Sequence, residues 1–166
     1  LEAGRLGFAG TAIAVAALLS GRDPWRERGA DMALRLERMR RHGLPEELAR
    51  TLRQLRRLAG LGEAAVEPAR CGAALALAFP ERIGQRRGRA GAFRLASGRG
   101  AVVDAAEPLA GEDWLVAAEL DDAGADARIR LAARLPAEEM ERIAADRALE
   151  RDEIAWDRRQ KLVTAR

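Results

Sequence analysis

Reactive side chains are scarce in this sequence of 166 residues, which holds one cysteine, one histidine and no tyrosine. A single cysteine cannot form an internal disulfide, and Cys71 with His42 supplies too few ligands for a structural metal site. A reducing, cytoplasmic location is the default expectation for such a chain. The sequence has no Ser-His-Asp set and no G-x-x-x-x-G-K-[ST] phosphate loop. We therefore expect neither a catalytic residue nor a bound cofactor in these residues.

Long apolar runs are also missing. The longest run, Phe8–Leu19, is shorter than the roughly 20 residues that a membrane-spanning helix needs. We interpret it as a buried helix and expect no membrane partner. Lys161 is the only lysine among 29 basic residues. Arginine offers planar, forked donors that suit phosphates and bases, although a GC-rich genome would produce the same bias.

Charge is divided unevenly along the chain. Residues 1–90 carry 17 arginines against 10 acidic residues, a net charge of +7. Residues 91–166 carry 12 basic against 16 acidic residues, a net charge of −4. The positive field therefore belongs to the first half of the chain, including residues 82–89 at its end.

The first half of the chain has the apolar spacing of helices. Helices are predicted at 8–20, at 30–41, from Pro45 to the glycines at 60 and 62, and at 69–79. The expected buried stripes contain Met32, Leu36 and Met39 in the second helix and Leu48, Leu52, Leu55 and Leu58 in the third. Cys71 lies in the apolar fourth helix and is interpreted as a core residue rather than a nucleophile. Arginines on the polar faces are typical of a solvated surface, with nucleic-acid binding as the alternative: Arg35, Arg38, Arg53, Arg56 and Arg57.

After Gly88 the apolar period becomes that of strands. A hairpin is predicted over 93–103, with further strands at 114–120, 128–135, 150–156 and 162–165 and a helix at 136–145. The clearest alternation predicts a core-facing set of Ile129, Leu131, Ala133 and Leu135 and a solvent-facing set of Arg128, Arg130 and Arg134. Short antiparallel strands interrupted by one helix fit a small Greek-key barrel of the oligonucleotide-binding (OB) type. The predicted fold is α+β, with a helical module at residues 1–88 and an OB-like barrel with one inserted helix at residues 89–166.

Several short phrases of the sequence resemble the carboxy-terminal region of HrpB-type ATP-dependent helicases of the DEAH class. The family's "ALAYPDRIAQRRG" resembles residues 76–88, and its "F-x-LA-x-GRG" resembles residues 93–100. A proline-leucine-alanine-glycine turn at 108–111 and a "W-L-V-x-A-x-L" strand at 114–120 follow in the family's order. The family's "ALLSERDP" resembles residues 17–24. This resemblance implies a helical module beside the single strand and a barrel that closes its channel.

By this resemblance the function is that of a non-catalytic accessory region of a helicase. The implied partners are single-stranded RNA or DNA and the motor lobes of the same helicase, which would bind ATP and Mg²⁺ outside these residues. Because the barrel has few aromatic residues, we expect contacts to phosphates rather than base stacking. The candidate contacts are Arg82, Arg86, Arg87, Arg89, Arg94, Arg99, Arg128 and Arg130. The choice of the segment 82–89 depends on the small number of acidic residues near it in the sequence.

Three alternatives accompany this interpretation. Arg128, Arg130 and Arg134 could pair with acidic residues on a solvated sheet face. The whole chain could instead be a docking or bracing module without nucleic-acid contact, which suits its acidic second half. A free-standing small enzyme is the third alternative and lacks a candidate nucleophile. Residues 85–91 also resemble the arginine-finger motif of DEAH helicases, but Ala92 stands where that motif ends in arginine.

Overall fold

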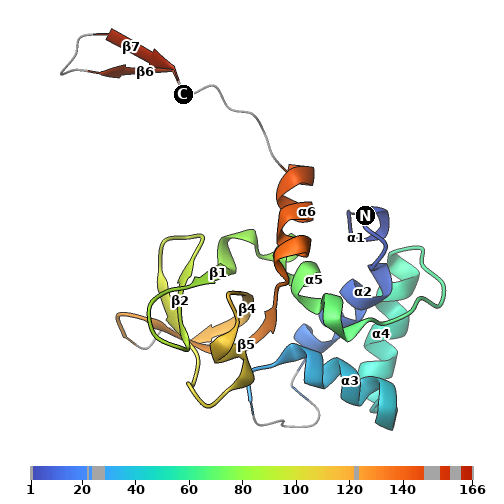
Figure 1. Ribbon diagram of the computed structural model, residues 1–166. Helices are drawn as coiled ribbons and strands as arrows, with labels where there is room; N and C mark the ends of the chain where they lie inside the picture. The colour runs from blue at the N-terminus through green and yellow to red at the C-terminus, as the bar shows by residue number, and fades with distance from the viewer. Residues whose placement is uncertain are drawn as a thin grey trace.

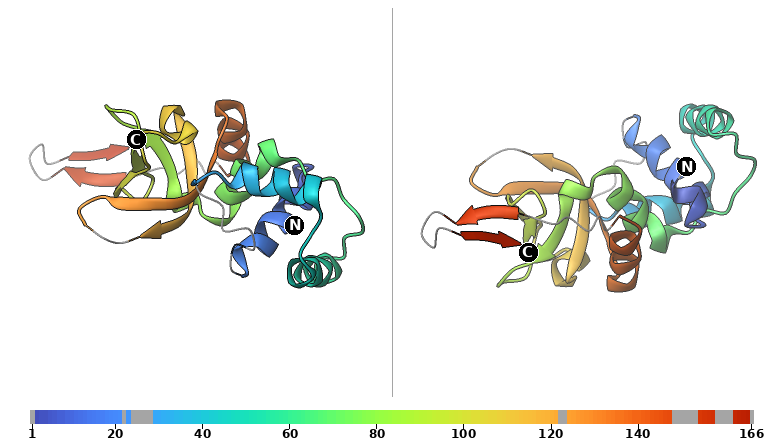
Figure 2. Two further views of the ribbon diagram at one scale, coloured as in Figure 1. Left: turned by 90° about the horizontal axis from the view of Figure 1, so that it is seen from below. Right: turned by 90° about the horizontal axis from the view of Figure 1, so that it is seen from above.

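A computed structural model describes residues 2–21, 23, 29–121, 124–147, 154–157 and 162–165 of the chain. Its helices lie on one side of the molecule and a closed β-barrel lies on the other (Figures 1 and 2). The helices are α1 (Glu2–Arg5), α2 (Ala9–Leu19), α3 (Met32–His42), α4 (Glu46–Leu58), α5 (Cys71–Ala78) and α6 (Ala137–Arg147). Short 3-10 turns occur at Pro68–Arg70, Pro80–Arg82 and Pro108–Gly111. The four helices predicted in the first half are confirmed, and α1 is an addition to them.

The barrel is built from β1 (Ile83–Arg86), β2 (Ala92–Leu95), β3 (Gly100–Val102), β4 (Trp114–Asp121) and β5 (Ala127–Arg134). Their order around the barrel is β1-β2-β3-β5-β4, closed by the pairing of β1 with β4. All the pairings are antiparallel except that of β3 with β5. This arrangement confirms the predicted α+β fold with an OB-like barrel.

Two details of the predicted barrel were wrong. Helix α6 follows β5, so it lies after the five barrel strands and not between them. Strands β6 (Ile154–Asp157) and β7 (Leu162–Ala165) pair with each other in a separate two-stranded sheet. Strand β1, within the basic residues 82–89, was not predicted. The division at residue 88 stays a prediction, but β1 places the start of the barrel before it.

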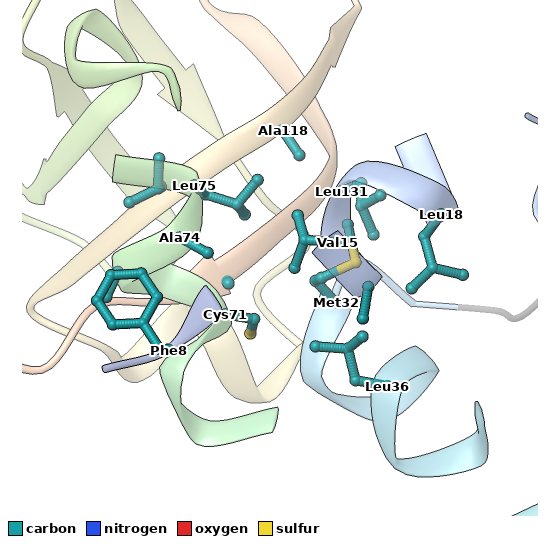
Figure 3. Packing of buried hydrophobic residues seen from close by; sticks show 14 of the residues in the cluster. Phe8, Val15, Leu18, Met32, Leu36, Cys71, Ala74, Leu75, Ala118 and Leu131 are labelled. Atoms are coloured by element: carbon teal, nitrogen blue, oxygen red, sulfur yellow. The ribbon is translucent and has the colours of Figure 1, made fainter. Parts of the chain in front are cut away.

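Two hydrophobic clusters hold the molecule together. One fills the barrel and includes Phe93, Leu115 and Ile129. The other lies between the helices and the outer face of β4 and β5, and it joins Leu36 and Leu75 to Leu131 (Figure 3). Each fully buried side chain of this size contributes about 1.5–3 kcal/mol. Because the second cluster takes residues from both sides of position 88, the helices and the barrel share a core.

Strand β5 contributes to both clusters, and a change of register makes this possible. Its partners in β4 pass from Ala117↔Ala132 to Glu119↔Leu131, and then to Leu120↔Ile129. Ala118 in β4 and Arg130 in β5 are the residues left out of this register. An extra residue turns the following side chains to the opposite face. Ile129 therefore points into the barrel, whereas Leu131, Ala133 and Leu135 point toward the helices.

Helix α5 packs closely on the end of β5. A Cβ atom on Gly72 would lie 1.9 Å from the carbonyl oxygen of Arg134, so only glycine fits at this crossing. Helix α4 packs on α2 through Leu48 and Leu52, which are buried. The expected burial of Leu58 was wrong, because this residue ends α4 and its side chain is 76% exposed. Among the described residues, none of the helices combines the length and hydropathy that a membrane crossing requires.

Candidate nucleic-acid interface

Strands β1, β2, β3 and β5 present a continuous outer surface, which we call the arginine face. Its exposed positions follow from the register: Gln85 lies opposite Arg94, Arg94 opposite Gly100, and Val102 opposite Arg128. Directly paired residues point to the same side of a sheet. Arg94 and Arg128 are both exposed, so they lie on the same outer side of the barrel with β3 between them. Adjacent strands lie about 4.8 Å apart, which separates β2 from β5 by roughly 10 Å.

Two loops border the arginine face. The loop of residues 87–91 connects β1 to β2 and contributes Arg87 and Arg89. The loop between β4 and β5 contributes Asp126. Arg87 donates a hydrogen bond from Nη2 to Oδ1 of Asp126, at 2.9 Å. Small barrels of this type bind oligonucleotides with the β2–β3 surface and with the loops between β1 and β2 and between β4 and β5.

The Arg87–Asp126 pair lies directly over Gly100 of β3. A Cβ atom at Gly100 would come within 1.8 Å of Asp126 Oδ1 and 2.5 Å of Arg87 Nη2. The missing side chain therefore makes room for this ion pair on the surface of the sheet. Gly100 belongs to the "GRG" phrase that carries the family resemblance, and its neighbour Arg99 is half-buried.

Three other candidate arginines have acidic partners. Arg86 donates to Asp113 at 2.5 Å, and Arg130 donates to Asp121 at 2.6 Å. Arg82 is 3.5 Å from Glu81, and it also donates to the carbonyl oxygen of Ala118. The argument that few acids lie near residues 82–89 was wrong, because Asp113 and Asp126 come from distant parts of the sequence. Pairing with acids is confirmed for Arg130 and for Arg134, whose Nε lies 3.0 Å from Glu112.

Three of the other candidates are not engaged in this way. Within the described part of the chain, Arg89, Arg94 and Arg128 make no ion pair and no side-chain hydrogen bond. These three guanidinium groups come from the β1–β2 loop, from β2 and from β5. They define the accessible positive charge of the arginine face.

A polar cavity of about 230 Å³ lies beside Arg128. It is lined by Arg35 and Arg130 and by the carboxylates of Asp104 and Glu107. Arg35 is 7% exposed, and it donates to Asp23 at 2.9 Å, to the carbonyl oxygen of Asp31 at 2.9 Å and to that of Gly29 at 3.0 Å. The interpretation of Arg35 as part of a solvated face was wrong, since it holds Asp23, Gly29 and Asp31 onto α3.

Aromatic stacking finds no support on the arginine face. Phe93 is buried inside the barrel, and Trp114 is half-buried against the helical cluster. The side chain of Trp156 lies outside the described residues. The described aromatic residues therefore leave phosphate contact as the chemistry that this face offers.

The single cysteine, Cys71, lies in the core between the helices and the barrel. Cys71 is buried, and this burial, with the Asp31 carboxylate as a smaller cause, raises the pKa of its thiol to about 12. A thiol with this pKa stays protonated at neutral pH and is a poor nucleophile, which confirms its interpretation as a core residue. No group of three histidine, cysteine or acidic side chains suited to a metal occurs in the described part of the chain. Residues 85–91, which resemble an arginine finger, form the end of β1 and the loop after it.

The fold and this face define an OB-type barrel protein with a helical module packed against it. The chain is homologous to the C-terminal region of HrpB, as the resemblance had predicted. It is 33% identical over 159 residues to the ATP-dependent RNA helicase HrpB of Escherichia coli (strain K12), a match that covers 95% of this chain and 19% of that protein. The chain therefore spans about a fifth of the length of this relative. No family model matches the chain.

Solved structures give the same result. The crystal structure of the E. coli DExH-box NTPase HrpB superposes with a TM-score of 0.71 at 30% identity. A second crystal structure, of the Escherichia coli DEAH/RHA helicase HrpB, gives a TM-score of 0.68 at 25% identity. Each covers 95% of this chain and 19% of the other. The helical module and the barrel thus have the arrangement found in HrpB.

Proposed function

We propose that this chain is a non-catalytic accessory region of an ATP-dependent helicase, which binds a single strand of RNA or DNA on the arginine face and helps to close the strand channel. The observation that carries the proposal is the set of three unengaged arginines, Arg89, Arg94 and Arg128, on the surface that barrels of this type use for oligonucleotides. Homology to HrpB supports it, because that relative is described as an RNA helicase.

The contacts on this face would go to the phosphate backbone. Guanidinium groups match phosphate oxygens with paired hydrogen bonds, and the described residues place no aromatic ring there for a base to stack on. Phosphate contacts fix the position of a strand without reading its sequence. The strand would therefore be held with little sequence preference. Arg82 lies outside the proposed interface, because its guanidinium is engaged by Ala118 and Glu81.

ATP and Mg²⁺ belong to other parts of the helicase in this proposal. The motor lobes would bind them, and the present residues would act on the strand as it leaves those lobes. A cytoplasmic location is part of the same proposal. The chain alone is expected to hydrolyse no nucleotide.

Fluorescence anisotropy with a labelled single-stranded RNA tests the proposal, with single-stranded DNA in parallel. The chain should bind with an affinity that falls as salt rises, since each phosphate contact on a single strand adds about −0.7 to the slope of log K against log salt. The triple variant Arg89→Ala, Arg94→Ala, Arg128→Ala should lose about 2 units of that slope and at least about tenfold in affinity at low salt.

A matched control removes three arginines from the polar face of α4, with the changes Arg50→Ala, Arg53→Ala and Arg57→Ala. Both variants lower the net charge by the same amount, so the control separates a local contact from a general charge effect. Equal losses in the two variants would contradict the arginine face as the interface. Absence of binding at low salt would contradict nucleic-acid binding by these residues altogether.

A second candidate function is docking onto the motor lobes of the same helicase. It is favoured by two apolar grooves on the helical module, of about 430 and 410 Å³. The first lies between α1, α2 and α5 and includes Leu77 and Phe79, and the second is bordered by Ile13 and the exposed Leu58. Binding over such grooves should resist added salt. The test is co-elution of the chain with the motor lobes of an HrpB-type helicase, which Leu58→Ser should weaken and the arginine variants should not.

A further inference from the structure

The carboxylate of Asp126 lies against the surface of β3. Its carboxylate lies over Gly100, and Gly100 lies opposite Arg94 on β2. On the other side of β3, Val102 lies opposite Arg128 on β5. The carboxylate of Asp126 thus occupies the middle of the arginine face, between the two unengaged strand arginines.

Stability does not require this ion pair. The Arg87 side chain is 49% exposed and that of Asp126 is 37% exposed. Ion pairs with this much solvent contribute about 0–1 kcal/mol, because water screens the charges and two side chains lose freedom. A Cβ atom at position 100 would displace the pair from its present place, and glycine leaves that place open. The arrangement is therefore better explained by what the two charges do on the surface.

A carboxylate and a phosphate compete for the same guanidinium. Both accept hydrogen bonds from the planar fork of arginine, and in the free chain the carboxylate of Asp126 already holds Nη2 of Arg87. An ionised carboxylate also offers only acceptors and repels a nearby phosphate. In the free chain Asp126 holds the position that a phosphate would take.

We propose that Asp126 is a built-in competitor that sets the affinity of the arginine face, so that a nucleic-acid phosphate binds Arg87 only by displacing the Asp126 carboxylate. This inference rests on the proposed function and names the residue that limits it. The exchange replaces one charge-assisted pair by another, so Arg87 adds little to the net binding free energy. A strand that is held in this way is also released readily, because Asp126 recaptures Arg87 when the phosphate leaves.

Asp126→Asn tests the competition. The amide keeps the size of the side chain and an oxygen acceptor but loses the negative charge. One unit charge at about 4 Å in a solvated site changes binding by roughly fivefold. The variant should therefore bind labelled single-stranded RNA about fivefold more tightly at low salt, and the gain should shrink at high salt.

The matched control is Glu46→Gln, which removes the carboxylate from a similar exposed pair. Glu46 lies 3.0 Å from Arg53 at the start of α4, a helix that lies away from the barrel (Figure 2). Both variants raise the net charge by one. Glu46→Gln should change the affinity by less than about twofold, because charges beyond a Debye length of about 8 Å are largely screened. An equal gain in the two variants would overturn the proposal.

The role of Arg87 is tested by repeating Asp126→Asn in an Arg87→Ala background. If the carboxylate competes for Arg87, its removal should then raise affinity by less than about twofold. A fivefold gain that persists without Arg87 would show general repulsion and would overturn the exchange. Binding by the unchanged chain with no gain in Asp126→Asn rejects this inference alone. Absence of binding in both forms rejects the proposed function with it.

Discussion

Arg82 donates a hydrogen bond from Nη1 to the carbonyl oxygen of Ala118, at 2.8 Å. Ala118 is the residue of β4 that the register with β5 leaves out. The side chain of Arg82 thus compensates for a break in the sheet, and its guanidinium also lies 4.7 Å from the centre of the Phe79 ring. The sequence made Arg82 a candidate phosphate contact, but in the structure its guanidinium binds a backbone carbonyl oxygen.

Replacing Arg82 should therefore affect stability more than binding. Arg82→Met keeps much of the apolar stem and removes the donor to Ala118, so we expect a loss of about 1–3 kcal/mol in the free energy of unfolding. Arg86→Met is the control, because Arg86 makes an exposed pair with Asp113 and should lose less than about 1 kcal/mol. Urea unfolding measures both. Similar losses in the two variants would show that the bond to Ala118 contributes little.

Gly72 gives the second prediction. A Cβ atom there would lie 1.9 Å from the carbonyl oxygen of Arg134, so Gly72→Ala must push α5 away from β5. We expect a loss of at least about 2 kcal/mol in the free energy of unfolding, because a packed core adjusts poorly to added volume. Gly62→Ala is the control, since nothing lies within 4 Å of a Cβ at that position. If thermal unfolding showed the same small change for both variants, the close approach of α5 to β5 would be contradicted.

The sequence predicted the elements whose signals are local. The stripe of Met32, Leu36 and Met39 and the apolar segment around Cys71 specify helices by their own spacing, and each lies in the core as expected. The hairpin of β2 and β3 could be predicted because its turn glycines lie next to its strands. The order of the strands around the barrel was not predicted, because no local pattern encodes it.

The features that the sequence did not predict depend on distant residues. The period-two alternation of β5 indicated one core, but the irregular register near Arg130 turns Ile129 and Leu131 to different cores. Asp126 is 39 residues from Arg87, and Asp113 is 27 residues from Arg86. Pairs at such separations are made by barrel closure. The accessible arginines could therefore be selected only once the fold was known.

Asp31 gives a prediction about pH. Its side chain accepts a hydrogen bond from the backbone N–H of Ala33, at 2.8 Å, and so caps the start of α3. Burial raises the pKa of this carboxyl above 3.8, and the charge of Glu107 adds to the effect against the lowering by Ala33 and Arg35. The folded state therefore favours the protonated form. Its contribution to stability is present below the unfolded pKa and is lost as pH rises through the folded pKa.

Asp31→Asn should remove this pH dependence. Asparagine caps helices about as well as aspartate and carries no charge to bury. We expect the variant to be at least as stable as the unchanged chain at pH 7, and the difference to decrease as pH falls below about 4. Urea unfolding between pH 3 and pH 7 measures it. A variant that is less stable than the unchanged chain at pH 7 would show that the attraction between Asp31 and Arg35 outweighs the cost of burial.

Arg70 connects three parts of the helical side of the molecule. Its Nε lies 3.0 Å from Oε1 of Glu139 in α6, and its Nη2 donates to the carbonyl oxygen of Leu6 at 3.1 Å. Its guanidinium carbon also lies 4.5 Å from the centre of the Phe8 ring. The side chains of Arg70 and Glu139 are only 18% and 15% exposed, so water screens this pair much less than the surface pairs.

Changing Arg70 should reduce stability more than changing Glu139. Arg70→Met leaves the Glu139 carboxylate partly buried without its main partner. We therefore expect the free energy of unfolding to fall by about 2–3 kcal/mol. Glu139→Gln keeps an oxygen that can accept from Arg70, and we expect a loss of about 1 kcal/mol. Hydrogen exchange should show faster opening of α6 in Arg70→Met than in Glu139→Gln. Ile143 of α6 is buried in the helical cluster. If α6 were equally protected in both variants and in the unchanged chain, the apolar contacts of Ile143 would be enough to hold α6 without the ion pair.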